Sequence, residues 1–253
     1  MKIIKPSVEI IQQYDGYEGM LKHIELCGRV CYKSEDKITD TSYIPFIRML
    51  IDKGHTSVLE HGTVMLRCMD YDGEHSWTLH QLVDGDCYTT TNYRLLYTAE
   101  KLLKEHWCDH KYNKRITARF VLPKAISREF CRHRSFSFSE QSTRYCNYSL
   151  GKLGGELTFI EPYWWDDNID MRLDFLNACE QAENFYLQMI ERGMSAQQAR
   201  DVLPLATKTE LVMTGFVEDW KHFFELRCAE NAHPQARALA TNLRELFKIN
   251  KLL

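Results

Sequence analysis

Residues 128–145 hold cationic, hydroxyl and aromatic side chains at an unusual density. The sequence there is REFCRHRSFSFSEQSTRY, with arginines at 128, 132, 134 and 144 and a histidine at 133. Like charges this close together repel each other unless an anion or several carboxylates neutralise them. A guanidinium offers two parallel donors to a phosphate, and the neighbouring serine and threonine hydroxyls add further donors. The stretch therefore predicts a site for an anionic ligand.

Two other interpretations of this stretch stay open. One is a solvated basic helix end paired with surface glutamates, which is what most runs of charge are. The other is a patch for single-stranded nucleic acid, because Phe136, Phe138 and Tyr145 alternate with the cations. The whole chain of 253 residues has 32 Lys and Arg against 35 Asp and Glu, a formal net charge of −3. This balance weakens the nucleic-acid interpretation and excludes a generally basic nucleic-acid coat.

Within the stretch, Arg132-His133-Arg134 is followed after seven residues by Ser142, and RHR-x7-S is the signature of the flavin-dependent thymidylate synthases. The chain resembles that family at three further places, in the same order along the sequence. LEHGT at 59–63 resembles the family's early EH-x-T element, and ARDVLPL at 199–205 resembles its ARxxLP segment. FELR at 224–227, followed by AHPQ at 232–235, resembles its C-terminal LR…AH segment.

The resemblance implies a methyltransferase that converts 2′-deoxyuridine 5′-monophosphate (dUMP) to thymidylate. The pyrimidine would receive a methylene group from 5,10-methylenetetrahydrofolate and a hydride from FAD that NADPH has reduced. It also implies a homotetramer whose sites are shared between subunits. Several anionic ligands converging on one site would explain a local cationic cluster in a mildly acidic chain. A flavin reductase without methyl transfer remains an alternative, as does the nucleic-acid module.

The resemblance also implies which residues bind each ligand. The expected dUMP contacts are Glu129, Arg132, Glu140, Gln141, Ser142, Arg144, Arg200 and Arg227. The expected FAD contacts are Cys31, His61, Thr63, Arg132, His133, Arg134, Glu140 and His222. Three of these depart from common family residues: Cys31 stands where many members have Ser, Glu129 where some have Gln, and His222 where some have Asn.

Arg227 is the expected catalytic residue, since the resemblance places it against the uracil ring and an arginine stays protonated in any plausible site. For Arg200, which lies in an apolar stretch, the choice is between a buried cation with an anionic ligand and an exposed cation paired with Asp201 or Glu210. We expect no cysteine nucleophile, because none of the nine cysteines stands in the Pro-Cys-His setting of the flavin-independent thymidylate synthases. The irregular spacing of the cysteines predicts buried free thiols.

A metal site is not expected. Histidines and a cysteine cluster in HWCDH at 106–110, with further histidines at 75 and 80. Their spacing is not a recognised zinc pattern.

Hydrophobic spacing predicts the elements that position these residues. In the first half, we expect a strand at 2–11 interrupted at Pro6, helices at 17–32 and 43–53, and a strand at 63–68. A hairpin around Asp84-Gly85, a short helix at 99–105, a strand at 115–122 and a helix from Pro123 towards Arg134 follow.

In the second half, we expect helices at 171–190, 195–214, 217–229 and 234–249, the second bent or broken at Pro204. The fold class is therefore α/β (α+β), with a small mixed sheet and a helical bundle forming much of the C-terminal half. With the family's tetramer in mind, we expect an obligate homo-oligomer.

The chain is expected to be one domain over 1–253, with a hairpin-like insertion at about 69–114. No GxGxxG or GxxxxGK[ST] motif follows a strand, so a nucleotide would be held in another way. No apolar run approaches the roughly 18 residues of a membrane span, and the start lacks the features of a signal peptide. A cytoplasmic protein without a membrane partner is expected.

Overall fold

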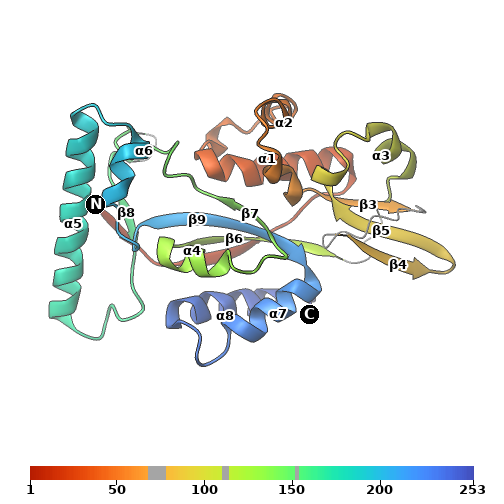
Figure 1. Ribbon diagram of the computed structural model, residues 1–253. Helices are drawn as coiled ribbons and strands as arrows, with labels where there is room; N and C mark the ends of the chain where they lie inside the picture. The colour runs from red at the N-terminus through yellow and green to blue at the C-terminus, as the bar shows by residue number, and fades with distance from the viewer. Residues whose placement is uncertain (68–77, 110–113, 152–153) are drawn as a thin grey trace.

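The computed structural model describes residues 1–67, 78–109, 114–151 and 154–253 (Figure 1). Its strands are β1 (Lys2–Ile4), β2 (Ser7–Ile11), β3 (Thr63–Arg67), β4 (Leu79–Val83), β5 (Asp86–Asn92), β6 (Arg115–Pro123), β7 (Ser137–Glu140), β8 (Thr158–Ile160) and β9 (Lys208–Phe216). Its helices are α1 (Gly16–Tyr32), α2 (Tyr43–Asp52), α3 (Glu100–His106), α4 (Lys124–Phe130), α5 (Ile169–Glu191), α6 (Ala196–Ala199), α7 (Val217–Arg227) and α8 (Pro234–Ile249). Short 3-10 turns occupy Glu35–Lys37, Thr56–His61, Tyr93–Leu95 and Arg200–Val202.

A four-stranded antiparallel sheet in the order β2-β6-β9-β7 forms the centre of the molecule. Its two long strands, β6 and β9, pair along their whole length, from Arg115 opposite Phe216 to Pro123 opposite Lys208. Helices α7 and α8 lie on one side of this sheet and α1 and α2 on the other (Figure 1). The mixed α/β class expected from the sequence is confirmed.

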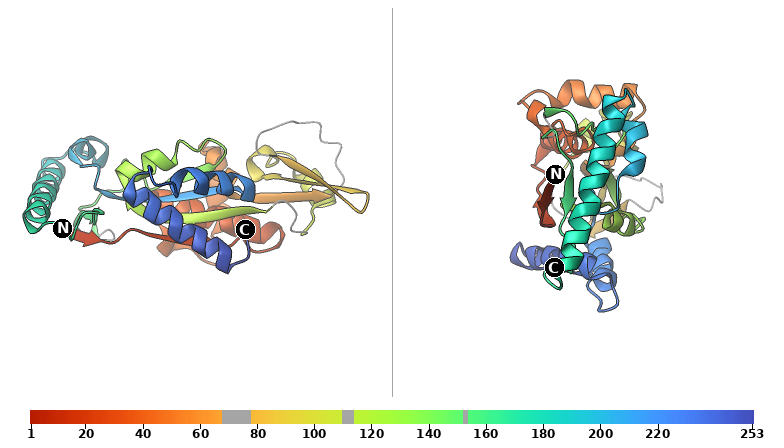
Figure 2. Two further views of the ribbon diagram at one scale, coloured as in Figure 1. Left: turned by 90° about the horizontal axis from the view of Figure 1, so that it is seen from below. Right: turned by 90° about the vertical axis from the view of Figure 1, so that its left-hand side faces the viewer.

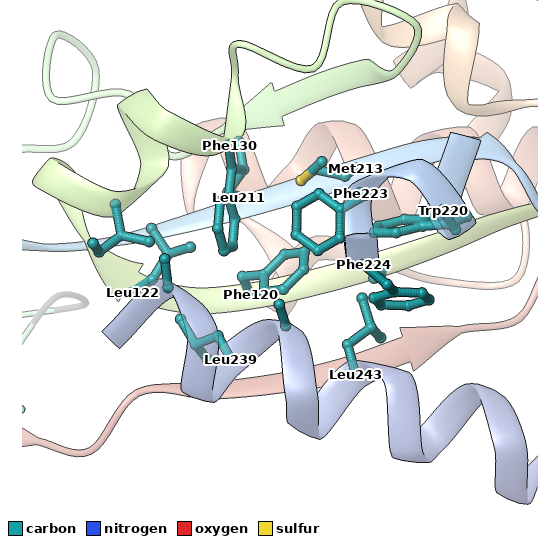
Figure 3. Close-up of a cluster of buried hydrophobic side chains, with 14 of the residues drawn as sticks. Phe120, Leu122, Phe130, Leu211, Met213, Trp220, Phe223, Phe224, Leu239 and Leu243 are labelled. Atoms are coloured by element: carbon teal, nitrogen blue, oxygen red, sulfur yellow. The ribbon is translucent and has the colours of Figure 1, made fainter. Parts of the chain in front are cut away.

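The two faces of the central sheet differ in chemistry because successive residues of a strand point to opposite sides. Alternate residues of β6 and β9, such as Phe120 and Met213, pack with α4, α7 and α8 in the main hydrophobic core (Figure 3). The residues between them include Arg119 and Glu210, which form a polar network, and Val212, which packs on α1. The sheet therefore has one apolar face and one largely polar face, and both are covered.

The predicted helix at 195–214 is wrong. Only Ala196–Ala199 is helical, the 3-10 turn at Arg200–Val202 follows, and residues from Lys208 onward form β9. Proline lacks the N–H that a helix needs, so Pro204 ends the helical pattern. Strand β9 is buried on both faces, so its sequence does not show the alternation of a half-exposed strand.

The C-terminal helices do not form one bundle as expected. Helix α5 packs with α6 and β8 in a separate cluster that contains Tyr148, Phe159 and Tyr186. Helices α7 and α8 instead pack on the central sheet. The remaining predicted helices are confirmed within a few residues, apart from the helix after Pro123, which ends earlier than expected, at Phe130.

The hairpin expected at Asp84-Gly85 is confirmed. Both residues have positive φ, 51° and 86°, as a two-residue turn between antiparallel strands requires. Strands β4 and β5 join β3 in a three-stranded sheet, which lies at the opposite end of the molecule from α5 (Figure 2). Within the insertion at 69–114, His75 and His110, two of the histidines considered as metal ligands, lie outside the described residues.

None of the described helices combines the length and the apolar character that crossing a membrane would require.

Candidate active site

Two of the predicted dUMP residues, Glu140 and Arg200, line one polar cleft, which has a volume of about 400 Å³. Three cations, Lys124, Arg128 and Arg200, share it with two carboxylates, Glu140 and Asp201. Helix α4, the end of β7 and the 3-10 turn after α6 supply these side chains. The cleft thus combines cations that suit a phosphate with carboxylates that can accept hydrogen bonds from a base or sugar.

Arg200 is half-buried at this cleft, and its Nη1 donates to Thr143 Oγ1 at 3.4 Å. Among the residues that the structure describes, it forms no ion pair, so neither Asp201 nor Glu210 neutralises it in the way expected for an exposed cation. Lys124, in contrast, donates to the Glu140 carboxylate at 2.9 Å. A guanidinium at a cleft without a carboxylate partner is suited to an anionic ligand.

The segment after β7 is tied to α1 and to α6. The Ser142 amide donates to the backbone oxygen of Cys31 at 3.0 Å, which brings these two predicted site residues together. Arg144 is exposed, and its Nε donates to Gln197 Oε1 at 3.1 Å. Gln141 is only 3% exposed and does not line the cleft.

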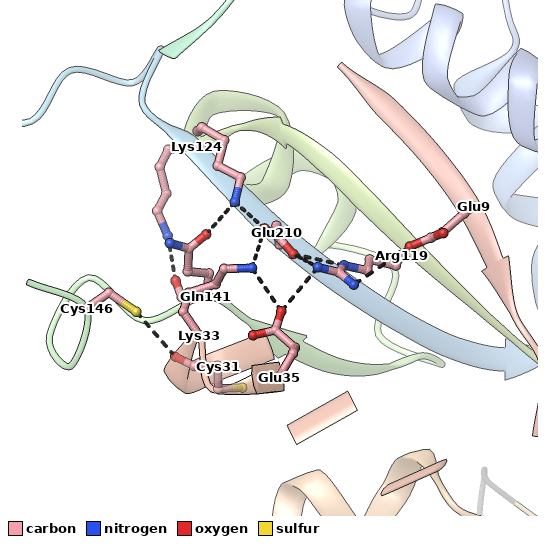
Figure 4. A network of polar contacts seen from close by, with 10 residues as sticks. Glu9, Cys31, Lys33, Glu35, Arg119, Lys124, Gln141, Cys146 and Glu210 are labelled. Carbon is pink, nitrogen blue, oxygen red and sulfur yellow. Dashed lines mark hydrogen bonds and ion pairs between the residues drawn. The ribbon is translucent and has the colours of Figure 1, made fainter. Parts of the chain in front are cut away.

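A buried carboxylate lies beneath this segment, on the polar face of β9. Glu210 accepts hydrogen bonds from Lys33 at 2.7 Å, from Arg119 at 2.8 Å and from Lys208 (Figure 4). Burial alone would raise the pKa of the Glu210 carboxyl, but Lys208 and Lys33 hold it at about 2. Glu210 is therefore ionised, and the cations around it neutralise its charge inside the protein.

A second group of predicted residues surrounds Arg227 at the end of α7. Its Nη1 donates to Glu129 Oε2 at 2.9 Å, its Nη2 to the Glu129 backbone oxygen at 2.7 Å, and its Nε to His133 Nε2 at 2.9 Å. Burial, the Arg227 charge and the nearby His222 lower the pKa of His133 to about 4, so a neutral imidazole accepts this hydrogen bond. The ring of His222 lies 6.5 Å from that of His133. Four residues predicted from the sequence thus form one group.

The three arginines at 128, 132 and 134 are exposed. Within the described ranges, none of them pairs with a carboxylate, so the interpretation as a helix end neutralised by surface glutamates is not what the structure shows. The positive charge at this end of α4 remains open to a ligand from outside the chain.

His61 and Thr63 lie apart from the polar cleft. His61 is fully buried, with Nδ1 2.7 Å from Thr214 Oγ1 and Nε2 2.9 Å from Ser139 Oγ. Burial, His23 and Arg115 lower the pKa of His61 to about 3, which keeps the ring neutral. Thr63 is half-buried and, with Arg115, lines a separate cavity of about 330 Å³. Thr63 therefore reaches the surface of a cavity in this chain, whereas His61 does not.

The sequence did not single out Lys124 or Lys208, and it indicated Glu210 only as a possible partner of Arg200. Lys124 lies four residues before Arg128, so the two share a helix face, and this spacing is a signal that the sequence contains. Lys208 and Glu210 lie two residues apart on one face of β9, a relation that is invisible when this segment is read as helix.

The described part of the chain contains no group of three or more His, Cys, Asp or Glu placed to hold a metal ion. Its eight cysteines are free thiols, as expected, but only Cys27, Cys146 and Cys179 are buried, so the expected burial is confirmed for those three alone. Cys228, which follows Arg227, is half-buried.

Comparison with known proteins supplies independent information. A family model described as thymidylate synthase complementing protein matches residues 114–249, a range that contains the polar cleft and Arg227. The flavin-dependent thymidylate synthase of Mycobacterium tuberculosis (strain ATCC 25618 / H37Rv) is 26% identical over 265 residues, which covers 96% of this chain and 81% of the relative. The enzyme of the same name from Mycolicibacterium gilvum is also 26% identical, with the same coverage.

Among solved structures, the UMP/dUMP methylase PolB from Streptomyces cacaoi bound with 5-Br UMP resembles the chain with a TM-score of 0.52. The two are 18% identical, and the match covers 98% of this chain and 91% of that chain. At this identity the likeness establishes a shared fold.

Proposed function

Because the chain belongs to the flavin-dependent thymidylate synthase family, we propose that it methylates dUMP to thymidylate, with 5,10-methylenetetrahydrofolate as carbon donor and NADPH-reduced FAD as hydride source. The chain is a methyltransferase of a flavin-dependent family. The observation that carries the proposal is the polar cleft, where Arg200 has no carboxylate partner among the described residues and lies within the matched range.

The substrate dUMP carries a phosphate dianion and a polar base, and the cleft offers complementary groups. We assign Arg200, Ser142 and Arg144 to the nucleotide because cations and hydroxyls are good phosphate partners. Glu129, Arg132, Glu140, Gln141 and Arg227 complete the proposed dUMP set. The burial of Gln141 restricts it to an indirect role in this set.

The flavin would bring a diphosphate, and the exposed arginines at 132 and 134 have no carboxylate partner within the described ranges, so they fit it. Cys31, Thr63, His133, Glu140 and His222 complete the proposed FAD contacts. His61 would influence the flavin site only indirectly, through its hydrogen bonds to Ser139 and Thr214, because its own side chain has no exposed surface. When bound, the reduced flavin supplies the hydride of the reaction.

Arg227 would stabilise the negative charge that develops on the pyrimidine ring. Its guanidinium stays protonated, and Glu129 and His133 fix its orientation in advance of the reaction. Such electrostatic stabilisation removes the need for a covalent bond from a cysteine, so we propose a mechanism without a cysteine nucleophile.

We further propose that the active enzyme is a homotetramer with shared sites. The polar cleft, at about 400 Å³, is near the lower end of the roughly 300–1,000 Å³ that a single small-molecule ligand commonly occupies. One such cleft is too small for dUMP, FAD and a folate together. Neighbouring subunits would supply the remaining walls.

The direct experiment is to incubate the FAD-loaded protein without oxygen with dUMP, methylenetetrahydrofolate and NADPH, and to measure thymidylate. Omitting any one of the three should abolish product. If the rate of NADPH oxidation is the same with and without dUMP and folate, the result would support a flavin reductase instead. Absence of thymidylate from the complete mixture would overturn the proposal.

A further inference from the structure

Gln141 is held from three directions although it is not exposed to the cleft. Its backbone N–H donates to the Glu210 backbone oxygen at 2.9 Å, and Lys208 Nζ donates to its Oε1 at 3.0 Å. Lys124 Nζ lies 3.4 Å from its backbone oxygen, as a second and longer contact. With a 3% exposed side chain, Gln141 is an internal anchor of the segment rather than a surface group.

Lys208 reaches Gln141 because Glu210 holds it there. The lysine and the glutamate are two residues apart on β9, so both side chains extend from the same face of the strand. The Glu210 side chain is 5% exposed and also binds Lys33 and Arg119 (Figure 4). An amine that is largely removed from water needs such a fixed counter-charge to stay ionised in one place.

The residues on either side of Gln141 are the ones assigned to the ligands. Glu140 ends β7 and binds Lys124, while the Ser142 amide binds the Cys31 backbone oxygen. Because a fixed Gln141 determines the backbone direction on both sides, a shift of this one residue moves both neighbours.

We propose that Lys208 is a positioning residue for the nucleotide site: held by Glu210, it fixes Gln141 and thereby sets the placement of Glu140 and Ser142 toward dUMP. This inference rests on the proposed function and adds to it a positioning residue that does not itself contact the ligand. Lys124 contributes a second contact to the same segment.

The test compares Lys208→Met with Lys33→Met in the full-length, FAD-loaded protein. Both variants remove one lysine from the Glu210 carboxylate, but of these two lysines only Lys208 contacts Gln141. We expect Lys208→Met to raise the KM and the Kd for dUMP about tenfold, the effect of losing roughly one charge-assisted hydrogen bond, with a smaller change in kcat. Lys33→Met should change both constants less than threefold, and Lys208→Arg, which can still bridge Glu210 and Gln141, should restore most of the binding.

A double-mutant cycle shows whether Lys208 acts through Gln141. If it does, Lys208→Met combined with Gln141→Met should bind dUMP no more weakly than the worse single variant. Additive losses, or equal losses in Lys208→Met and Lys33→Met, would overturn the inference.

Amide hydrogen exchange at residues 140–142 separates this inference from the proposed function, because it needs no turnover. We expect faster exchange in Lys208→Met than in Lys33→Met. Equal exchange rates would overturn the positioning role even if the wild type makes thymidylate. Faster exchange would support it even if the wild type makes none, in which case only the proposed function fails.

Discussion

Glu129 and Arg227, 98 positions apart in the sequence, are joined by two hydrogen bonds, one to the carboxylate at 2.9 Å and one to the backbone oxygen at 2.7 Å. The first links the ends of two different helices, α4 and α7, and the second fixes the plane of the guanidinium. Arg227 therefore has a defined orientation before any ligand binds. Preorganised charge of this kind is a large source of catalytic rate in enzymes.

Replacing Arg227 with Ala should lower kcat by about 10²-fold or more, because it removes the cation that we propose stabilises charge on the pyrimidine. FAD binding should be retained, since Arg132 and Arg134 remain. Steady-state kinetics and flavin absorbance measure the two effects. Lys221→Ala, an exposed cation on the same helix, is the control and should keep wild-type kinetics. Undiminished turnover by Arg227→Ala would reject its catalytic role.

For the orientation of Arg227, we expect the side-chain oxygen of Glu129 that accepts its hydrogen bond to matter more than the negative charge of Glu129. Glu129→Gln keeps an acceptor for Arg227 and should retain kcat within about threefold, whereas Glu129→Leu loses the side-chain acceptor and should lose about tenfold. Parallel kinetic measurements on the two variants decide the point. Equal activity in both would show that the pair does not orient Arg227.

Acid should destabilise the protein partly through Glu210. Its pKa is about 2 in the folded protein against 4.5 for an unperturbed carboxyl, so the unfolded state binds the proton first as pH falls. The stabilisation is complete above about pH 4.5 and is lost between about 4.5 and 2. Urea unfolding over this range should give a flatter pH dependence for Glu210→Gln than for the wild type. Identical slopes would contradict the ionised, paired state of Glu210.

The core under α7 should be sensitive to truncation. Phe223 is fully buried against Phe120, Phe130 and Trp220, so Phe223→Ala should cost about 3–5 kcal/mol of unfolding free energy. Leu226 on the same helix is 50% exposed, and Leu226→Ala should cost much less, within about 0.5 kcal/mol. Urea unfolding followed by circular dichroism measures both. Similar costs for the two variants would contradict the described packing.

Local chemistry made parts of the fold predictable. The Asp84-Gly85 turn requires two positive φ angles, which this dipeptide adopts readily, and the hairpin was placed correctly. Strand β9 was missed because burial on both faces removes the alternating pattern that marks a strand. The strand is nevertheless central, since it carries Lys208 and Glu210.

In the site, too, features set by local sequence could be predicted and features set by tertiary packing could not. The motif at 132–142 located the cationic segment, because residue type and spacing are visible in the sequence. The contacts between Arg227 and Glu129, and between Lys208 and Gln141, join distant parts of the chain, and only the packing of β9, α4 and α7 brings them together. The burial of His61 and Gln141 also depends on tertiary structure, so neither could be placed from sequence alone.

The most direct test of the central claim follows the flavin absorbance of the FAD-loaded protein without oxygen. NADPH should bleach the flavin, and colour should return only when both dUMP and methylenetetrahydrofolate are present, with thymidylate formed in step. Recovery of the colour when dUMP or methylenetetrahydrofolate is left out would contradict the proposal that this chain forms thymidylate. Failure of the protein to take up FAD at all would contradict it as well.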